Sequence, residues 1–225
     1  MKHIIWERPA VDQVVFDKFL ALKNVLSLSC VLSDAQERDN VMRHTMQWRS
    51  VNERIIGPAL TVKLTAGDIV DCLAVFEVAK PGDLVVIDAF GETETSIWGG
   101  LMSGLAKAAG IVGVVIDGSA RDIDEARMLN FPVYSTCVSP RASHTAYSGR
   151  KDPIEINTPI VCGGIIVHPG DLVVADEIGV VIAPAVKLEY TYEKVKAQAD
   201  KEELTRRDVL NGATVDELLE KYRRI

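Results

Sequence analysis

The stretch SIWGGLMSGLAKAAGIVGVVIDGSARDIDEARMLNFPV, residues 96–133, decides the fold of this chain. Its Gly-rich turn leads into a helix that we expect to begin near Leu101. The apolar run from Ile111 to Ile116 predicts a buried strand, which we expect Asp117-Gly118 to end. A charged turn then opens a short helix from about Asp122 to Leu129. This succession of turn, helix, strand and helix is typical of an α/β fold.

Segments upstream also predict helices and strands in alternation. Residues 11–22 place apolar side chains at near-helical spacing and predict a helix. The segment LSLSCVLSDAQ, residues 26–36, predicts a short strand or turn that leads into a second helical stretch. PALTVKL and LVVIDAF predict strands, and between them we expect a helix capped by Asp68 that runs through Val78.

The pattern changes after Arg121, where the short helix is followed by strands. PVYSTCV, PIVCGGIIV, DLVVADE and GVVIAP predict strands, the first separated from the others by a polar loop over residues 139–152. A run of strands after a strand-helix-strand unit predicts an α/β protein built as a mixed β/β/α sandwich rather than a plain doubly wound sheet. HPGDLVVADEIG echoes KPGDLVVIDAFG, which we interpret as shared turn chemistry rather than a duplicated half.

The C-terminal part of the chain predicts two helices. A long amphipathic helix should run from about Ala185 to Leu210, and a short one should follow the capping box of Thr214 and Glu217. We therefore expect one domain over residues 1–225, with a helical extension over about 185–225.

Composition narrows the classes of function. The chain has 225 residues, 48% of them hydrophobic, with a formal net charge of −7 and a sequence pI of about 5.2. Such a charge leaves no broad basic field for nucleic acid, and the apolar runs are too short to span a bilayer. The N-terminal residues lack the long apolar region of a signal peptide, so we expect a cytoplasmic protein. The four cysteines are scattered, which argues against a zinc site or a disulfide framework.

The charged turn after the central strand is the candidate site. Arg121 can grip a carboxylate with two parallel hydrogen bonds, although a surface ion pair is the plainer interpretation. Asp122 can hold a magnesium ion together with several waters, or it can serve as a helix N-cap. Glu125 lies one helical turn further on the same face, whereas Asp124 points elsewhere and suits a solvated acid.

The Gly-rich turn is the second part of the candidate site. A helix that begins there leaves the backbone N–H groups of Gly100, Leu101 and Met102 free to bind an anion. The alternative is a tight strand-to-helix turn without a ligand.

These two turns form a G-x20-R-D-x2-E pattern from Gly100 to Glu125. The pattern resembles that of the metal-dependent pyruvate aldolases acting on 4-hydroxy-4-methyl-2-oxoglutarate and related acids. That RraA-like family also includes the "regulator of ribonuclease activity A" proteins. Further blocks similar to the family, in family order, are IIGPALTVKLTAGD, KPGDLVVIDAFG, FPVYSTCVSPR and VCGGIIVHPGDLVVADEIGVVIAP.

The resemblance implies a swivelling-domain type of fold and a class II, metal-dependent lyase. Such an enzyme cleaves a 4-hydroxy-2-oxo acid to pyruvate and a carbonyl product, with oxaloacetate decarboxylation as a side activity. It implies that Asp122 holds Mg²⁺ or Mn²⁺, that Arg121 and the turn at Gly100 bind the oxo acid, and that Glu125 orients a water. It also implies a homotrimer, or a homohexamer built from trimers, with sites between subunits.

One departure from the family concerns the general base. Several aldolases of this kind carry an acid where this chain has Gly100. Replacement bases are a water activated by the metal, or one of four glutamates: Glu92, Glu94, and, from a neighbouring subunit, Glu202 or Glu203.

Other residues and functions remain as alternatives. Lys63 and Lys107 are weak candidates for a Schiff base, and His144 for contact with the far end of a substrate. The family also allows a non-catalytic regulator that binds a ribonuclease or another protein. The intact Arg121, Asp122 and Glu125 set favours an enzyme, because a regulator has no need of carboxylates beside an anion pocket.

Overall fold

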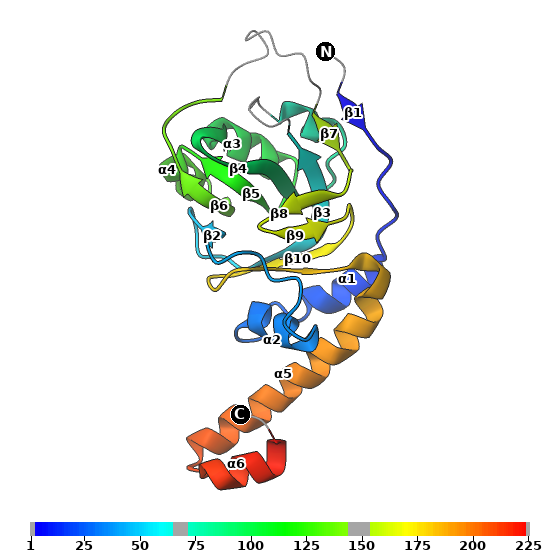
Figure 1. Ribbon diagram of the computed structural model, residues 1–225, viewed down its shortest axis with the longest axis vertical. Helices are drawn as coiled ribbons and strands as arrows, with labels where there is room; N and C mark the ends of the chain where they lie inside the picture. Colours follow the sequence, from blue (N-terminus) through cyan, green and yellow to red (C-terminus); the bar gives the residue numbers. More distant parts are fainter. Residues whose placement is uncertain (1–2, 65–71, 144–153, 224–225) are drawn as a thin grey trace.

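The computed structural model describes residues 3–64, 72–143 and 154–223 (Figure 1). The strands are β1 Ile4–Ile5, β2 Gln47–Trp48, β3 Ile55–Lys63, β4 Leu84–Trp98, β5 Gly113–Ala120, β6 Val133–Val138, β7 Glu155–Ile156, β8 Ile160–Cys162, β9 Ile165–Val167, β10 Leu172–Ala175 and β11 Val180–Ala183. The α-helices are α1 Gln13–Leu20, α2 Leu28–Ala35, α3 Gly100–Ala108, α4 Ile123–Met128, α5 Leu188–Leu210 and α6 Val215–Tyr222, and the 3-10 helices are η1 Leu73–Glu77 and η3 Ala185–Lys187.

The main sheet has the strand order β1-β7-β3-β4-β5-β6-β2. Its centre is parallel, from β3 through β4 and β5 to β6, and antiparallel pairs flank it at β7 and β2. β10 pairs antiparallel with the first half of β3 and with β11, so the strand β3 joins two parts of the sheet. The sequence accounts for the mixed sheet. Parallel strands need long crossover connections, which the first half of the chain provides, whereas the later strands follow one another closely and pair antiparallel.

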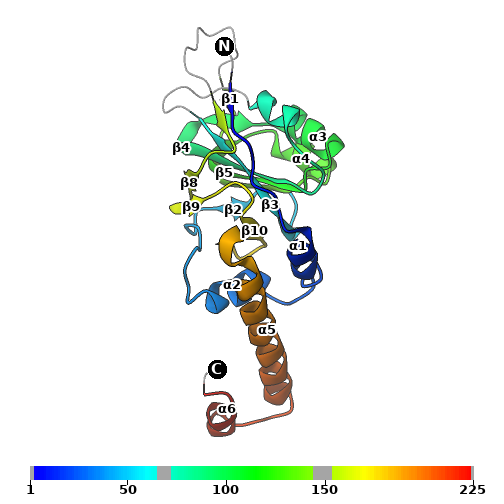
Figure 2. The ribbon, with the colours of Figure 1, turned by 90° about the vertical axis from the view of Figure 1, so that its right-hand side faces the viewer.

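Three apolar clusters separate the layers. One lies between the parallel strands and the helices η1, α3 and α4. A second lies on the opposite face of the same strands, under β8 to β11. The third joins β10 and β11 to α1, α2 and α5 (Figures 1 and 2). The β/β/α sandwich with terminal helices that the sequence predicts is confirmed.

Two predicted elements differ from the structure. β5 does not end at Asp117-Gly118 but runs to Ala120, because the long strand β4 shifts its register three times to remain paired with it. Residues 28–35 form the helix α2 rather than a strand or turn, since Leu28, Val31 and Leu32 are buried at helical spacing. The residues directly after α2 form turns and a bridge instead of the expected second helical stretch, and Asp68 lies outside the described residues.

The two Pro-Gly-Asp turns share one geometry, as the sequence echo predicts. Gly82 and Gly170 have φ values of +91° and +86°, which glycine adopts without strain. The Asp83 carboxylate accepts a hydrogen bond from the N–H of Lys80 at 2.7 Å, and that of Asp171 accepts one from His168 at 2.8 Å. Burial raises the pKa of the Asp171 carboxyl, and the hydrogen bonds that it accepts partly offset this shift.

The C-terminal helices confirm the predicted lengths and the capping box of Thr214 and Glu217. The first half of the apolar stripe of α5 packs within the chain. Leu188 and Val195 are buried against α1 and α2 of the same chain, and Tyr192 packs on Phe19. The remaining half of α5 extends away from the sheet (Figure 2). None of the helices in the described ranges has the length and apolar character that crossing a bilayer requires.

A buried carboxylate holds α2 in place. The N-cap Ser27 makes no side-chain hydrogen bond to its own helix. Asp176, in the turn between β10 and β11, accepts hydrogen bonds from the N–H of Ser29 at 3.0 Å and from its hydroxyl at 2.7 Å. Asp176 also accepts the N–H of Ile178, and the Arg54 guanidinium lies 3.7 Å away. The N-terminus of α2 is therefore capped by Asp176, which lies 147 positions after Ser29 in the sequence.

We predict that Asp176→Ala lowers the free energy of unfolding by about 2–4 kcal/mol, because it leaves buried donors and the Arg54 charge without their acceptor. Urea unfolding followed by circular dichroism measures the change. Asp200→Ala, at an exposed position of α5, is the matched control and should change stability by less than about 0.5 kcal/mol. Equal effects of the two substitutions would contradict the assigned cap.

Candidate active site

The site forms where β4 and β5 end side by side. The N–H of Arg121 donates to the carbonyl of Trp98 at 2.8 Å, which ties the last residue of β4 to the residue after β5. Trp98 is buried, stacks on Phe131 at 6.3 Å between ring centroids, and donates its indole N–H to the Ser103 hydroxyl at 3.0 Å. These contacts fix the two turns that follow the strands, one leading into α3 and the other into α4.

Asp122 occupies the N-cap position of α4 but does not cap it. Its backbone is left-handed, with φ of +51°, and its side chain makes no hydrogen bond to its own helix. One carboxylate oxygen, Oδ2, instead accepts the N–H of Gly100 at 3.2 Å and lies 3.3 Å from Nε of Arg121. Strained backbone of this kind often accompanies functional sites. The helix-cap interpretation of this aspartate is therefore wrong.

The two glycines of the turn leave room for carboxylates. A β-carbon added to Gly99 would lie 2.6 Å from Oδ2 of Asp122. One added to Gly100 would lie 1.8 Å from Oε2 and 2.7 Å from Cβ of Glu125. Both distances are far shorter than van der Waals contact, so neither glycine can carry a side chain while the acids keep these positions. Glu125 thus fills the space that a side chain on residue 100 would take.

The start of α3 offers backbone donors beside these carboxylates. The first helical hydrogen bond is donated by the N–H of Ser103 to the carbonyl of Gly99, and Gly99 provides no side-chain cap. The helix ladder therefore has no acceptor for the N–H groups of Leu101 and Met102, which remain able to bind an anion. The sequence predicts a free N–H group on Gly100 as well, but in the structure this group donates a hydrogen bond to the Asp122 carboxylate.

The structure thus brings together all six predicted site residues at one surface position. The Arg121 and Asp122 side chains are 39% and 37% exposed, so they remain accessible to a ligand. The members of this group are Gly100, Leu101, Met102, Arg121, Asp122 and Glu125.

The weaker candidates lie in other environments. Lys107 donates to the carbonyl of Leu129, and Lys63 lies 3.8 Å from the Glu155 carboxylate, so neither has the environment of a Schiff-base lysine. Glu92 accepts the N–H of Glu94 at 2.7 Å and thereby closes its own turn. Asp124 is exposed, as expected for a solvated acid.

Two further groups lie away from the site. The C-terminal half of α5, which carries Glu202 and Glu203, lies at one end of the molecule, and α3 and α4 lie at the other (Figure 1). These two glutamates can therefore act only at the site of another subunit. His144 lies outside the described residues.

The donor set fits a weakly held magnesium ion rather than a fully protein-coordinated metal. Within residues 3–64, 72–143 and 154–223, no three His, Cys, Asp or Glu side chains cluster in a way that could hold a metal ion. Magnesium needs only one or two carboxylates and takes its other ligands from water and substrate. Asp122, with Glu125 close by over Gly100, meets that requirement.

Known proteins identify the family. Residues 29–182 match the RraA-like family, described as Aldolase/RraA. The chain belongs to the RraA-like family. A protein of Halalkalibacterium halodurans named "Putative 4-hydroxy-4-methyl-2-oxoglutarate aldolase" is 36% identical over 204 residues, which cover 90% of this chain and 94% of that protein.

Solved structures agree with this membership. An uncharacterized protein from Pseudomonas syringae pv. tomato has a TM-score of 0.76 and 25% identity over 93% of this chain and 98% of its own. Streptomyces coelicolor RraAS2, described as an unusual member of the RNase ES inhibitor RraA protein family, has a TM-score of 0.73 and 25% identity, covering 88% and 99% of the two chains.

The structure of this RraA-like chain also contains a charged hollow that the sequence did not reveal. It has a volume of about 620 Å³ and lies on the opposite face of the sheet from α3 and α4, between the carboxylates of Asp88 and Asp117 and the strands β8 and β9. Burial raises the pKa of Asp88, and the nearby Asp117 charge adds to this shift. Arg43 lies 3.2 Å from Asp117. In the sequence, this hollow is marked only by one acid within each of the strands β4 and β5, Asp88 and Asp117, which pair with each other in the sheet.

Gly100→Ala should destabilise the protein by about 1–3 kcal/mol, because the new methyl group overlaps Glu125 and must displace α4. Gly104→Ala is the matched control on the same helix, since a β-carbon there would come no closer than 3.8 Å to a neighbour, Cδ1 of Leu129. That substitution should stabilise the helix by about 0.5–1 kcal/mol. Thermal unfolding of both variants measures the difference, and a Gly100→Ala variant as stable as Gly104→Ala would refute the close approach of Glu125.

Proposed function

We propose that this protein is a divalent-metal-dependent lyase that cleaves a 4-hydroxy-2-oxo acid, of the 4-hydroxy-4-methyl-2-oxoglutarate type, to pyruvate and a carbonyl product. The observation that carries the proposal is the convergence of the Arg121 guanidinium, the Asp122 carboxylate and the first backbone N–H groups of α3 at one exposed turn. The name of the Halalkalibacterium relative supports the same substrate class.

Recognition of the oxo acid rests on Arg121 and the α3 N-terminus. The guanidinium is planar and can donate two parallel hydrogen bonds to the substrate carboxylate. The N–H groups of Leu101 and Met102 face the same region and carry the positive end of the helix dipole. Together they hold the pyruvyl part of the substrate and stabilise negative charge that develops on its keto oxygen.

Asp122 is the residue that would hold Mg²⁺ or Mn²⁺. A bound divalent ion supplies a Lewis acid that polarises the substrate keto group. In the retro-aldol reaction the C3–C4 bond breaks, its electron pair forms the enolate of pyruvate, and the proton of the 4-hydroxyl passes to a base. Oxaloacetate gives the same enolate when carbon dioxide leaves, which accounts for the proposed decarboxylase side activity.

Glu125 is a carboxylate of this site that can serve the proton transfer. Its Oε2 lies directly over Gly100, beside the turn that binds the oxo acid. It can position a water that takes the hydroxyl proton. The glutamates of a neighbouring subunit, Glu202 and Glu203, remain alternatives for the base.

A homo-oligomer, trimer or hexamer, would complete this site. The rim of the site is apolar, with Leu101 84%, Leu105 49% and Met128 88% exposed. Large apolar side chains around a polar site often mark a surface that another subunit covers. Such a cover would exclude water from the reacting oxo acid and strengthen the interactions of Arg121 and Asp122 with it.

The test is pyruvate formation from oxaloacetate and from 4-hydroxy-4-methyl-2-oxoglutarate by purified protein with added Mg²⁺, read with lactate dehydrogenase and NADH. We expect turnover that disappears in excess chelator and returns with excess metal. Asp122→Asn should lose at least about 100-fold in kcat/KM, the scale of a lost charge interaction of roughly 3 kcal/mol in the transition state. Asp124→Asn is the matched control on the same helix and should retain turnover. Turnover that persists in excess chelator contradicts the metal mechanism, and absence of turnover with metal favours the regulator.

A further inference from the structure

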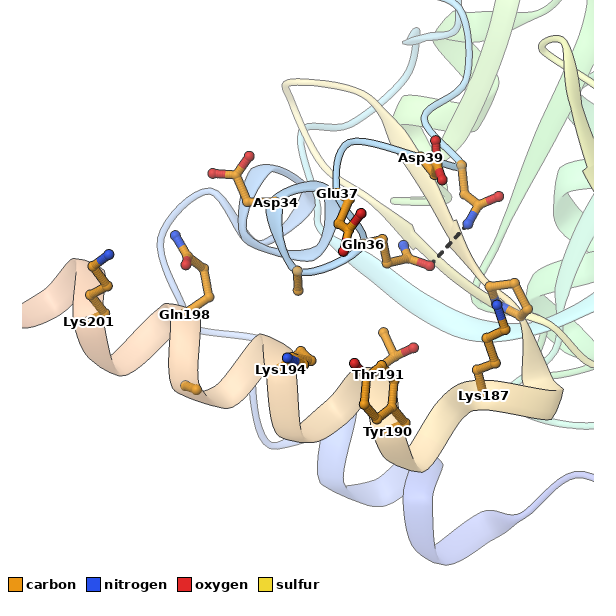
Figure 3. Close-up of a pocket in the computed structure, with 14 residues that line it drawn as sticks. Asp34, Gln36, Glu37, Asp39, Lys187, Tyr190, Thr191, Lys194, Gln198 and Lys201 are labelled. Atoms are coloured by element: carbon orange, nitrogen blue, oxygen red, sulfur yellow. Dashed lines mark hydrogen bonds between the residues drawn. The ribbon is translucent and has the colours of Figure 1, made fainter. Parts of the chain in front are cut away.

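A groove of about 570 Å³ separates α2 and its following turn from α5 (Figure 3). It lies at the end of the molecule away from α3 and α4 and the candidate active site (Figure 1). Its two walls carry opposite charge. The wall on α2 and the turn presents acids, and the wall on α5 presents lysines. The charged lining residues are Asp34, Glu37 and Asp39 on the first wall and Lys187, Lys194 and Lys201 on the second.

The lysines form a regular row that begins at Lys187, the last residue of η3, and continues along one face of α5 with Lys194 and Lys201. They recur every seven residues, so each lies two helical turns from the next and all three point to the same side. Tyr190, between Lys187 and Lys194, is 65% exposed, and the Lys194 ammonium lies 5.4 Å from the centroid of its ring. The apolar face of α5 points toward α1 and α2 instead, so this row does not serve the core of the chain.

The acidic wall is built by an unusual turn. Glu37, Arg38 and Asn40 all have positive φ, between +60° and +74°. The Asn40 amide donates to the Gln36 side chain at 3.1 Å, and Gln36 donates to the carbonyl of Ile182 at 2.9 Å. These bonds hold the turn against the sheet, so that the exposed Glu37 and Asp39 carboxylates stay on the wall facing the lysines.

We propose that this groove is a two-fold contact surface for a second copy of this chain. A two-fold axis that lies along the groove places each acidic wall over the lysine wall of the partner, and the same contact occurs twice. A surface with two parallel walls of opposite charge is therefore complementary to itself, which is the requirement for an isologous contact. An axis across the groove would instead place acid on acid, so the charge pattern selects one arrangement.

The contact is mainly ionic. It pairs Glu37 and Asp39 of each copy with Lys194 and Lys187 of the other, which lie at the same positions along the groove (Figure 3), while Tyr190 gives an apolar point near the axis. Salt screens charge pairs at an exposed rim. The screening length is about 8 Å at physiological ionic strength and about 3 Å at 1 M. The contact is distinct from the apolar rim around Arg121, and it does not rest on the proposed activity.

A charge-swap experiment tests this contact by molar mass. One variant carries Lys187→Glu and Lys194→Glu, and the other carries Glu37→Lys and Asp39→Lys. Each variant alone should have half the wild-type mass in light scattering, because like charges then meet twice. An equimolar mixture should regain the wild-type mass, since both contacts of the mixed pair are again between opposite charges.

The matched control is Lys80→Glu with Lys196→Glu, which changes the net charge equally but leaves the groove intact. Both lysines are exposed, and Lys196 lies on the opposite side of α5, where it pairs with Asp200. The control should keep the wild-type mass. The proposal is overturned by a wild-type mass that is an odd multiple of the 24.6 kDa chain, by groove variants that keep the wild-type mass, or by a mixture that fails to reassemble.

Discussion

The absence of side chains at Gly99 and Gly100 is the constraint on which the candidate site depends. It lets the carboxylates of Asp122 and Glu125 reach the backbone at the start of α3, closer than any β-carbon would allow. The hydrogen bond from the Gly100 N–H to Asp122 then joins the turn after β4 to the turn after β5. Acids, a guanidinium and helix N–H groups thereby occupy a single position, although their residues are separated by a helix and a strand.

The fold supports this position from beneath. β4 and β5 are paired over their whole shared length, and β4 absorbs its additional residues in register shifts before it returns to pair Trp98 with Ala120. Trp98 anchors the end of that strand in the apolar cluster under α3 and α4. The site therefore lies at the carboxyl ends of neighbouring parallel strands, where α/β folds commonly bind ligands. The Asp122 carboxylate is held there by a backbone hydrogen bond that needs no ligand.

Local sequence signals predicted much of this architecture. The capping box of Thr214, the length of α5 and the paired Pro-Gly-Asp turns are all set by residues close together in the chain, and all are confirmed. The grouping of Arg121, Asp122 and Gly100 was also predictable, because each follows directly from a strand end or a turn.

The features that the sequence did not reveal depend on distant residues. The cap of α2 comes from Asp176, which is 147 positions away from Ser29, so a local pattern could not identify that helix. The extension of β5 depends on irregularities in its neighbour β4. The charged walls of the α2–α5 groove likewise come from segments about 150 residues apart in the chain, and only the fold brings them together.

Calorimetric titration with oxalate, a stable mimic of the pyruvate enolate, measures recognition at this site without requiring turnover. We expect the wild-type protein to bind oxalate in the presence of Mg²⁺ and chelator to abolish this binding. Arg121→Lys should weaken it by about 1–3 kcal/mol, or roughly 5- to 150-fold, since lysine cannot donate the paired hydrogen bonds. Arg207→Lys, at an exposed position of α5, should bind as the wild type does. Equal affinity of Arg121→Lys and the wild type, or binding that persists in chelator, would contradict the assignment of this turn as a metal-assisted oxo-acid site.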